Sequence, residues 1–180
     1  DQGAVGLRPP ALLSAEHHIG EFDCGVKVLD QWLCRYAMQS QQAGATRTFV
    51  VTDDQGGVAG YYSLAAGSVD HVTATPRAKK GLARHPIPVM VLARLAVDRR
   101  YQGRGLGRSL LRDAILRTLG ISEHAGIRAL LVHAKNDPAR RFYAQHGFEP
   151  SPIDPFIMML LIKDARRALD LMRVAGEIAE

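Results

Sequence analysis

The chain has 180 residues, enough for one domain with a sizeable core, and its 47% hydrophobic and 23% charged residues are typical of a soluble globular protein. No apolar run approaches the roughly 20 residues that cross a bilayer, and the first residues lack a signal-peptide pattern, so we expect a cytoplasmic protein without membrane association. The formal net charge of +5 indicates an anionic partner, although a charged surface that only promotes solubility explains it equally well.

The first third of the chain predicts one helix and a β-hairpin. Leu7–Leu13 has the composition of a strand, and apolar residues at spacings of three and four predict an amphipathic helix over Val28–Met38. Thr46–Thr52 and Val58–Ala65 are rich in β-branched and aromatic residues, and the turn residues Asp53–Gly57 separate them. We therefore expect these two strands to pair as an antiparallel hairpin.

A polar and basic stretch, Ser68–Pro88, follows the hairpin. It contains Thr, Pro and a cluster of cations, so we expect a long, exposed connection. The basic residues that we consider as contacts of an anionic partner are Arg77, Lys79, Lys80 and Arg84 in this connection and Arg94 in the strand after it. The alternative is that the first four form an ordinary solvated face and that Arg94 anchors a carboxylate or a carbonyl.

The second half of the chain alternates between buried strands and amphipathic helices. Their expected ranges are Val89–Val97, Leu106–Leu119, Ala129–His133, Ala139–His146, Phe156–Ile162 and Lys163–Ile178. Gly120 and Gly147 stand where glycine often ends a helix. The order of elements predicts an α/β fold with a mixed, mostly antiparallel central sheet flanked by helices. We expect one domain over residues 1–180, of which 163–180 form a C-terminal helical tail.

Cysteine and histidine follow no pattern of a disulfide framework or a metal site. Cys24 and Cys34 lack CxxC spacing, so we expect both to be reduced and structural. The seven histidines show no ligand spacing, and we predict no metal.

A glycine-rich segment, Gln102–Gly107, joins a predicted buried strand to a helix. Backbone amides at that position receive anions readily, although the segment by itself is also consistent with a tight structural turn. Gly105 and Gly107 would each cost about 1 kcal/mol inside a helix, which favours a function for them. Arg104, Arg108 and Arg112 recur every four residues. Such stacked like charges near the positive end of a helix are unfavourable unless an anion neutralises them.

Two motifs resemble those of the GNAT acetyltransferase superfamily. They are Leu95-Ala-Val with Gln102-x-x-Gly105-x-Gly107, and Asn136-x-x-Ala139-x-x-Phe142-Tyr143-x-x-x-Gly147-Phe148. The resemblance implies a GNAT fold and acetyl-CoA as cofactor, with the pantetheine arm along the strand and the pyrophosphate on the loop amides. The cofactor-binding residues that it implies are Leu95, Ala96, Val97, Gln102, Gly103, Arg104, Gly105, Leu106, Gly107, Arg108, Asn136, Ala139 and Phe142.

The same resemblance implies that Tyr143 is the catalytic acid, whereas the residue alone would be interpreted as a tyrosine that packs its helix. The oxyanion donor that we expect is the backbone N–H of Val97 or its neighbour. Val89–Val97 holds no carboxylate where the family often has a glutamate base. At pH 7 about 0.04% of lysine amines but about 14% of α-amines are neutral, so the missing base favours an α-amine acceptor. Glu16 and Asp98 are possible water-mediated bases, and ordinary surface roles explain both residues as well.

A second resemblance extends over most of the chain. Its motifs are Phe22-Asp-Cys-Gly25, Leu29-Asp-x-Trp-Leu33, Arg47-Thr-Phe-Val-Val51, Gly60-Tyr-Tyr-x-Leu64 and Pro88-Val-x-x-Leu92-x-Arg94-Leu95. They are similar to those of the acetyltransferase toxins of bacterial type II toxin–antitoxin pairs.

That resemblance implies acetylation of the α-amino group on charged tRNA, which blocks translation, and it implies a homodimer neutralised by a ribbon-helix-helix antitoxin. The alternatives are an acetyltransferase for a protein N-terminus, a lysine or a small amine, and a non-catalytic regulator that binds acyl-CoA. Because few exposed aromatic residues suggest themselves as stacking platforms, we expect RNA recognition by shape and phosphate. The RNA contacts that we expect are Arg77, Lys79, Lys80, Arg84 and Arg94.

Overall fold

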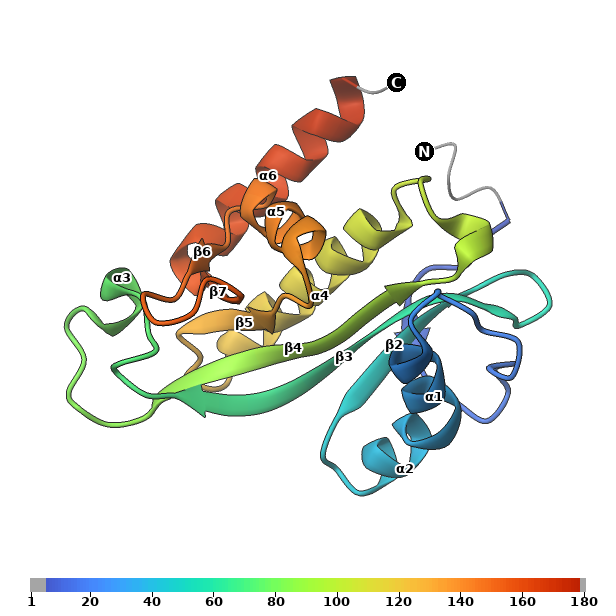
Figure 1. Cartoon of the computed structure of the whole chain (residues 1–180), viewed down its shortest axis with the longest axis horizontal. Coiled ribbons are helices and arrows are strands. Elements are labelled where there is room, and N and C mark those ends of the chain that lie inside the picture. Colours follow the sequence, from blue (N-terminus) through green and yellow to red (C-terminus); the bar gives the residue numbers. More distant parts are fainter. Residues whose placement is uncertain (1–5, 179–180) are drawn as a thin grey trace. The chain divides into compact units, whose positions relative to one another are not determined.

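The computed structural model describes residues 6–178 and contains a seven-stranded sheet with the strand order β1-β2-β3-β4-β5-β7-β6 (Figure 1). The strands are β1 Ala11–Leu12, β2 Arg47–Thr52, β3 Val58–Val69, β4 Ile87–Val97, β5 Ala129–His133, β6 Glu149–Pro150 and β7 Ile157–Leu161. Strands β4 and β5 are parallel, and the pairs β1–β2, β2–β3, β5–β7 and β6–β7 are antiparallel. The prediction of a mixed, mostly antiparallel sheet flanked by helices is confirmed.

Six α-helices and one 3₁₀ turn accompany the sheet within the described residues. They are α1 Lys27–Arg35, α2 Ala37–Gln42, α3 Pro76–Lys79, η1 Arg99–Tyr101, α4 Leu106–Ser122, α5 Asp137–Gln145 and α6 Ile162–Ile178. The chain forms two compact units, Asp1–Ala65 with Ala93–Ala114, and Ala66–Leu92 with Ile115–Glu180. Strands β3 and β4 and helix α4 each contribute residues to both units, and the single domain over 1–180 stays a prediction.

The first unit contains the hairpin β2–β3 and the N-terminal helices. Helices α1 and α2 pack beside β2, and a buried cluster that includes Leu33, Val50 and Tyr61 fills the space between them (Figure 1). The helix expected over Val28–Met38 is two helices, because the backbone at Tyr36 leaves helical geometry (φ −121°). The first strand is only Ala11–Leu12, since the two prolines directly before it have no N–H to donate to a neighbouring strand.

The second unit contains β5, β7 and the helices of the C-terminal half. Its buried cluster includes Val69, Ala78, Ile87 and Leu131. Val69, Ala78 and Ile87 lie within the stretch Ser68–Pro88, so the expectation of an exposed connection is wrong at these three residues. Single apolar residues anchor this polar stretch, and it carries the short helix α3.

Two hydrogen-bonded groups secure α3. The Thr75 hydroxyl accepts a hydrogen bond from the Ala78 amide, which caps the start of the helix. The Arg128 guanidinium donates to the carbonyls of Arg77, Ala78 and Lys80, which lie at its end. A helix this short does not satisfy those carbonyls itself.

The predicted ends of two helices differ from the observed ones. Helix α4 continues through Gly120 to Ser122, whose hydroxyl donates to the Leu119 carbonyl at 2.6 Å. Gly120 is not among the glycines with positive φ, so it does not serve as the helix-ending residue that we expected. Gly147, with φ of 92°, follows α5 as predicted.

Candidate functional site

The glycine loop leads from β4 into α4 and belongs to the first unit. Gly103 and Gly105 have φ angles of 77° and 79°, a conformation that other residues rarely adopt. A Cβ atom placed on either glycine would meet no other atom within 4 Å. Because α4 begins at Leu106, Gly105 lies outside the helix, and its backbone conformation is the reason for glycine there.

Five successive backbone amides of the loop have no acceptor in the described part of the chain. Within residues 6–178, the amides of residues 103 to 107 donate no hydrogen bond, whereas the Ser109 amide donates to the Gly105 carbonyl at 3.1 Å. The buried Leu106 side chain anchors the start of the 17-residue helix. Amides at the positive end of a long helix, beside glycines that leave open space, form a receptor for an anion such as a pyrophosphate.

The Gln102 side chain fixes the start of this loop with two hydrogen bonds. Its side-chain amide nitrogen donates to the Val97 carbonyl at the end of β4 and to the Cys24 carbonyl, both at 2.9 Å. Both N–H donors of the side chain are therefore used within the protein. The Gln102 side chain therefore holds the loop in position, and its contact with the cofactor stays a prediction.

Asp98, directly after β4, is a buried structural ion with 1% of its surface exposed. Its carboxylate accepts hydrogen bonds from the Asp23 amide and from the amide and guanidinium of Arg100, at 2.9 to 3.2 Å. Burial opposes ionisation, but the hydrogen bonds from Arg100 and Asp23 outweigh it and lower the pKa of the Asp98 carboxyl. A carboxylate with this many donors is poorly suited to act as a base, and Glu16 is exposed.

The strand that the resemblance assigns to the pantetheine arm ends in a partly buried segment. Ala96 is buried in the core cluster of the first unit, whereas Leu95 and Val97 are half-buried. The Asp98 amide donates to the Ala59 carbonyl at 2.8 Å. The amide after Val97 is therefore engaged, and the oxyanion donor at Val97 stays a prediction.

The arginines of the loop do not form the expected helical row. Arg104 precedes the helix and is exposed, with its guanidinium 5.7 Å from the centroid of the Tyr101 ring, so only Arg108 and Arg112 lie on α4. The argument from three stacked charges is thus wrong for Arg104, because the chain turns at Gly105 before the helix begins.

Helix α5 carries the predicted tyrosine and lies in the second unit. The Asn136 side chain accepts a hydrogen bond from the Ala139 amide at 2.9 Å, which makes Asn136 the N-cap of α5. The Tyr143 ring makes edge contacts with Phe142 and Phe148, at centroid distances of 5.1 and 5.4 Å. Half-buried Phe142 thus supports the tyrosine directly.

Packing explains the position of the Tyr143 ring but gives no role to its hydroxyl. The residue is 8% exposed, and burial raises the pKa of its hydroxyl to about 12. No described residue exchanges a hydrogen bond with that hydroxyl. The group is therefore protonated at neutral pH and available to donate a proton or a hydrogen bond.

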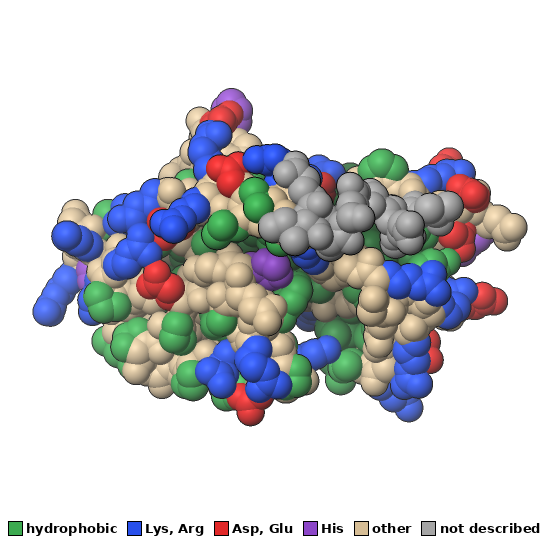
Figure 2. Space-filling view, turned by 90° about the horizontal axis from the view of Figure 1, so that it is seen from above, with side chains coloured by type: hydrophobic (Ala, Val, Ile, Leu, Met, Phe, Trp, Pro, Cys, Tyr) green, Lys and Arg blue, Asp and Glu red, His purple; other side chains and the backbone are tan. Residues whose placement is uncertain are grey.

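The basic residues of the connection differ in how firmly they are bound. Arg77 forms ion pairs with Glu149 at 2.6 Å and Asp164 at 2.9 Å, so two carboxylates compensate its charge. Lys79 donates to the His71 carbonyl at 3.3 Å. Lys80 and Arg84 are exposed and have no ion pair among residues 6–178. On the face shown in Figure 2, Lys and Arg side chains form several separate groups with Asp and Glu among them.

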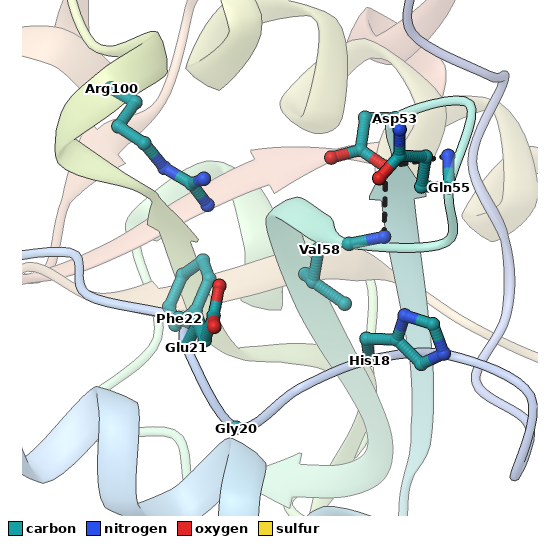
Figure 3. Close-up of a pocket in the computed structure, with 9 residues that line it drawn as sticks. His18, Gly20, Glu21, Phe22, Asp53, Gln55, Val58 and Arg100 are labelled. Atoms are coloured by element: carbon teal, nitrogen blue, oxygen red, sulfur yellow. Dashed lines mark hydrogen bonds between the residues drawn. The ribbon is translucent and has the colours of Figure 1, made fainter.

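A polar cavity of about 460 Å³ in the first unit was not predicted (Figure 3). Its lining residues are His18, Gly20, Glu21, Phe22, Asp53, Gln55, Gly57, Val58 and Arg100. Asp53 accepts hydrogen bonds from the amides of Gln55 and Gly57, and Arg100 is bound by Asp98. The cavity contains none of the predicted site residues, and these two charges already have partners.

Two further properties concern the whole described part of the chain. No helix within residues 6–178 has the length and apolar composition to span a membrane. The same residues contain no group of three or more His, Cys, Asp or Glu side chains arranged to hold a metal ion.

The chain is similar to known acetyltransferases. Residues 45–150 match a family model described as an acetyltransferase (GNAT) domain. A Mycobacterium tuberculosis protein named tRNA-acetylating toxin is 46% identical over 161 residues, which cover 89% of this chain and 96% of that protein. Both matches span more than half of the chain.

Two solved structures share the fold at 26% sequence identity. The structure of AtaT complexed with acetyl-methionyl-tRNAfMet has a TM-score of 0.82 and covers 89% of this chain and 98% of AtaT. The structure of a tyrosine-to-phenylalanine mutant of AtaT, bound to the C-terminus of the antitoxin AtaR and to acetyl-CoA, has a TM-score of 0.78. It covers 90% of this chain and 97% of the other.

Proposed function

The chain belongs to the GNAT family of acetyltransferases, and from that premise we propose that it acetylates the α-amino group of an aminoacyl-tRNA with acetyl-CoA as donor. The observation that carries the proposal is the loop at residues 103 to 107, whose five amides have no acceptor among the described residues. The 46% identity to a tRNA-acetylating toxin supports the choice of acceptor.

The residues of the loop fit the pyrophosphate of acetyl-CoA. Gly103 and Gly105 present backbone without a side chain, and the space where a Cβ would stand is open. The amides and the helix dipole supply partial positive charge without the desolvation of a lysine or arginine side chain. We propose that the backbone of residues 103 to 108 holds the pyrophosphate and that Gln102 keeps the loop in position.

The chemistry that we propose requires one proton donor and no dedicated base. The amine nitrogen forms a bond to the acetyl carbon while the bond from that carbon to sulfur breaks. The Tyr143 hydroxyl supplies the proton that the leaving sulfur takes up, the amine releases a proton to water, and the tyrosinate then takes a proton back from water. A tyrosine whose pKa is about 12 is a weak acid, so hydrogen bonding to the sulfur is part of this role.

The absence of a base on β4 supports an α-amine as acceptor. The strand has no carboxylate, and Asp98 at its end is engaged by Arg100 and the Asp23 amide. An amine with a pKa near 7.8 is neutral in about 14% of molecules at pH 7, so an aminoacyl ester can react without help. A lysine acceptor would need a base.

The partners that we propose follow from the relatives. AtaT has been solved with acetyl-methionyl-tRNAfMet, and an AtaT mutant with the antitoxin AtaR. We propose that this chain acts as a toxin on charged tRNA in the cytoplasm, as a homodimer, and that a ribbon-helix-helix antitoxin neutralises it. Lys80 and Arg84 are the residues of the basic connection best placed for RNA phosphates, because no ion pair within residues 6–178 compensates them.

The test is transfer of labelled acetyl from acetyl-CoA to charged tRNA. Purified protein is incubated with a panel of aminoacylated tRNAs, with the same tRNAs uncharged, with a peptide that carries a free N-terminus and a lysine, and with small amines. We expect label on one or more charged tRNAs only. Transfer to the peptide or to a small amine, with none to charged tRNA, would refute the proposed acceptor and leave the acetyltransferase assignment in place.

A further inference from the structure

A stack of aromatic rings in the first unit ends in an arginine. The Phe22 ring makes an edge contact with Tyr61 (5.4 Å), and the Trp32 ring lies nearly parallel to Tyr61 (6.1 Å, 12°). The Arg94 guanidinium carbon lies 4.0 Å from the Trp32 ring centroid. The Tyr61 hydroxyl donates to the Leu29 carbonyl at 2.7 Å, which ties the stack to α1. Arg94 is therefore held against a rigid support.

Arg94 has no anionic partner among the residues that the structure describes. No described residue accepts a hydrogen bond from its guanidinium or forms an ion pair with it. Burial lowers the pKa of this half-buried side chain, and no carboxylate is near enough to raise it. A partly desolvated cation without a counter-ion is unfavourable, so its presence points to an anion that comes from outside.

The stacked position leaves the hydrogen-bonding groups of Arg94 available. The guanidinium carbon lies over the Trp32 ring, and no described residue accepts a hydrogen bond from the guanidinium N–H groups, which lie in one plane. A planar set of donors in a defined orientation matches two oxygens of one phosphate group. The aromatic support reduces the entropy that the side chain would lose on binding.

This anion is separate from the pyrophosphate of acetyl-CoA. Ala96 belongs to the same buried cluster as Tyr61, and side chains two apart on a strand share a face, so Arg94 lies on that face of β4. Val97 points to the opposite face, where its side chain is the nearest atom, at 3.8 Å, to a Cβ built on Gly107. The pyrophosphate loop thus borders the other face of the strand from Arg94.

We propose that Arg94, supported by Trp32, binds a phosphodiester of the tRNA acceptor. This inference rests on the proposed function, since the RNA is the second anionic reactant of that reaction. To the sequence-based prediction that Arg94 contacts RNA, the proposal adds which groups bind the phosphate and what holds the side chain in place. Trp32 is a positioning residue: it holds the Arg94 guanidinium and does not need to stack on a base itself.

The experiment compares Arg94→Gln and Arg94→Lys with the wild-type protein in filter binding of aminoacyl-tRNA over a range of salt concentrations. We expect Arg94→Gln to weaken binding about tenfold and to reduce the slope of log K against log salt by about 0.7 to 0.9, the contribution of one phosphate. Arg94→Lys retains the charge but lacks the planar donors. We expect its salt slope to be close to that of the wild-type protein and its tRNA affinity to stay below the wild-type value. In acetylation assays the KM for aminoacyl-tRNA rises while kcat changes little.

Matched variants separate this role from folding. Arg35→Gln removes an exposed cation from α1, the helix of Trp32, and serves as the control that leaves tRNA affinity unchanged. Trp32→Leu removes the support and should weaken tRNA binding, whereas Trp32→Phe should restore most of it. Acetyl-CoA affinity, measured by calorimetry, should be the same for all Arg94 variants, which also reports that their fold is intact.

The possible failures are distinguishable. If Arg94→Gln binds tRNA with wild-type affinity and salt slope, the inference is overturned while the proposed function stands. If that variant instead loses affinity only for an acidic antitoxin peptide, Arg94 belongs to the antitoxin contact and the inference is equally overturned. If the wild-type protein transfers acetyl to no charged tRNA, the proposed function itself fails.

Discussion

Removal of the Tyr143 hydroxyl distinguishes a role of this group as the catalytic acid from a role in stabilising the fold. The ring packs against Phe142 and Phe148, and the hydroxyl exchanges no hydrogen bond with the described residues. Tyr143→Phe keeps every ring contact and deletes one oxygen. We therefore expect the free energy of unfolding to change by no more than about 0.5 kcal/mol and the affinity for acetyl-CoA to stay the same.

The expected loss lies in the chemical step. A positioned proton donor contributes about 10² to 10⁴ in rate, which corresponds to about 3 to 6 kcal/mol in the activation barrier. We expect kcat of Tyr143→Phe to fall by that factor while KM for both substrates changes by less than about threefold. Because burial raises the pKa of the hydroxyl to about 12, the wild-type rate should not decline between pH 8 and 10 through ionisation of this tyrosine.

The assay is single-turnover transfer of labelled acetyl at saturating concentrations of both substrates, with thermal unfolding measured on the same preparations. Tyr36→Phe is the control, because Tyr36 is 53% exposed and lies between α1 and α2. Full activity of Tyr143→Phe would refute the role as acid. A melting temperature lowered by several degrees together with lost activity would instead indicate that the hydroxyl supports the fold.

Four other substitutions or conditions test the remaining assignments. Asp98→Asn should lower the free energy of unfolding by about 2 to 3 kcal/mol in urea titrations, because its carboxylate accepts several charge-assisted hydrogen bonds; exposed Asp170→Asn is the control. Since the pKa of Asp98 is lowered in the folded state, this stability is present above about pH 4 and lost as the pH falls, and the acid transitions of wild type and variant should converge. Asn136→Ala should lose about 1 kcal/mol of stability and Asn136→Asp almost none, because Asp also caps a helix; equal stability of the two would refute the N-cap role. Arg77→Ala should change tRNA affinity less than Arg84→Ala in filter binding, since Glu149 and Asp164 already neutralise Arg77, and the reverse order would contradict this reasoning. Above pH 10 the wild-type protein should lose stability as the buried Tyr143 is forced to ionise, by about 2 kcal/mol by pH 12, and Tyr143→Phe should lack that component in alkaline urea titrations.

The amino-acid sequence by itself determined the elements whose signals are local. The periodicity of apolar residues and the positions of glycine predicted the hairpin, β4, α4 and α5 to within a few residues, because helix and strand periods are properties of neighbouring residues. The loop at residues 103 to 107 was identified in the same way. Tyr143 was identified only by its place in a family motif. The periodicity of its helix predicted no more than a packed residue.

Tertiary structure decided which polar groups are available. Gln102 meets Cys24 across 78 residues of sequence, and Asp98 meets Asp23 across 75, so no local pattern shows that these side chains are engaged. Arg94 reaches Trp32 in the same way, and only the fold shows that it stacks on an aromatic ring and has no carboxylate partner among the described residues. The physical reason is that hydrogen bonding and desolvation depend on neighbours in space, whereas the sequence records neighbours along the chain.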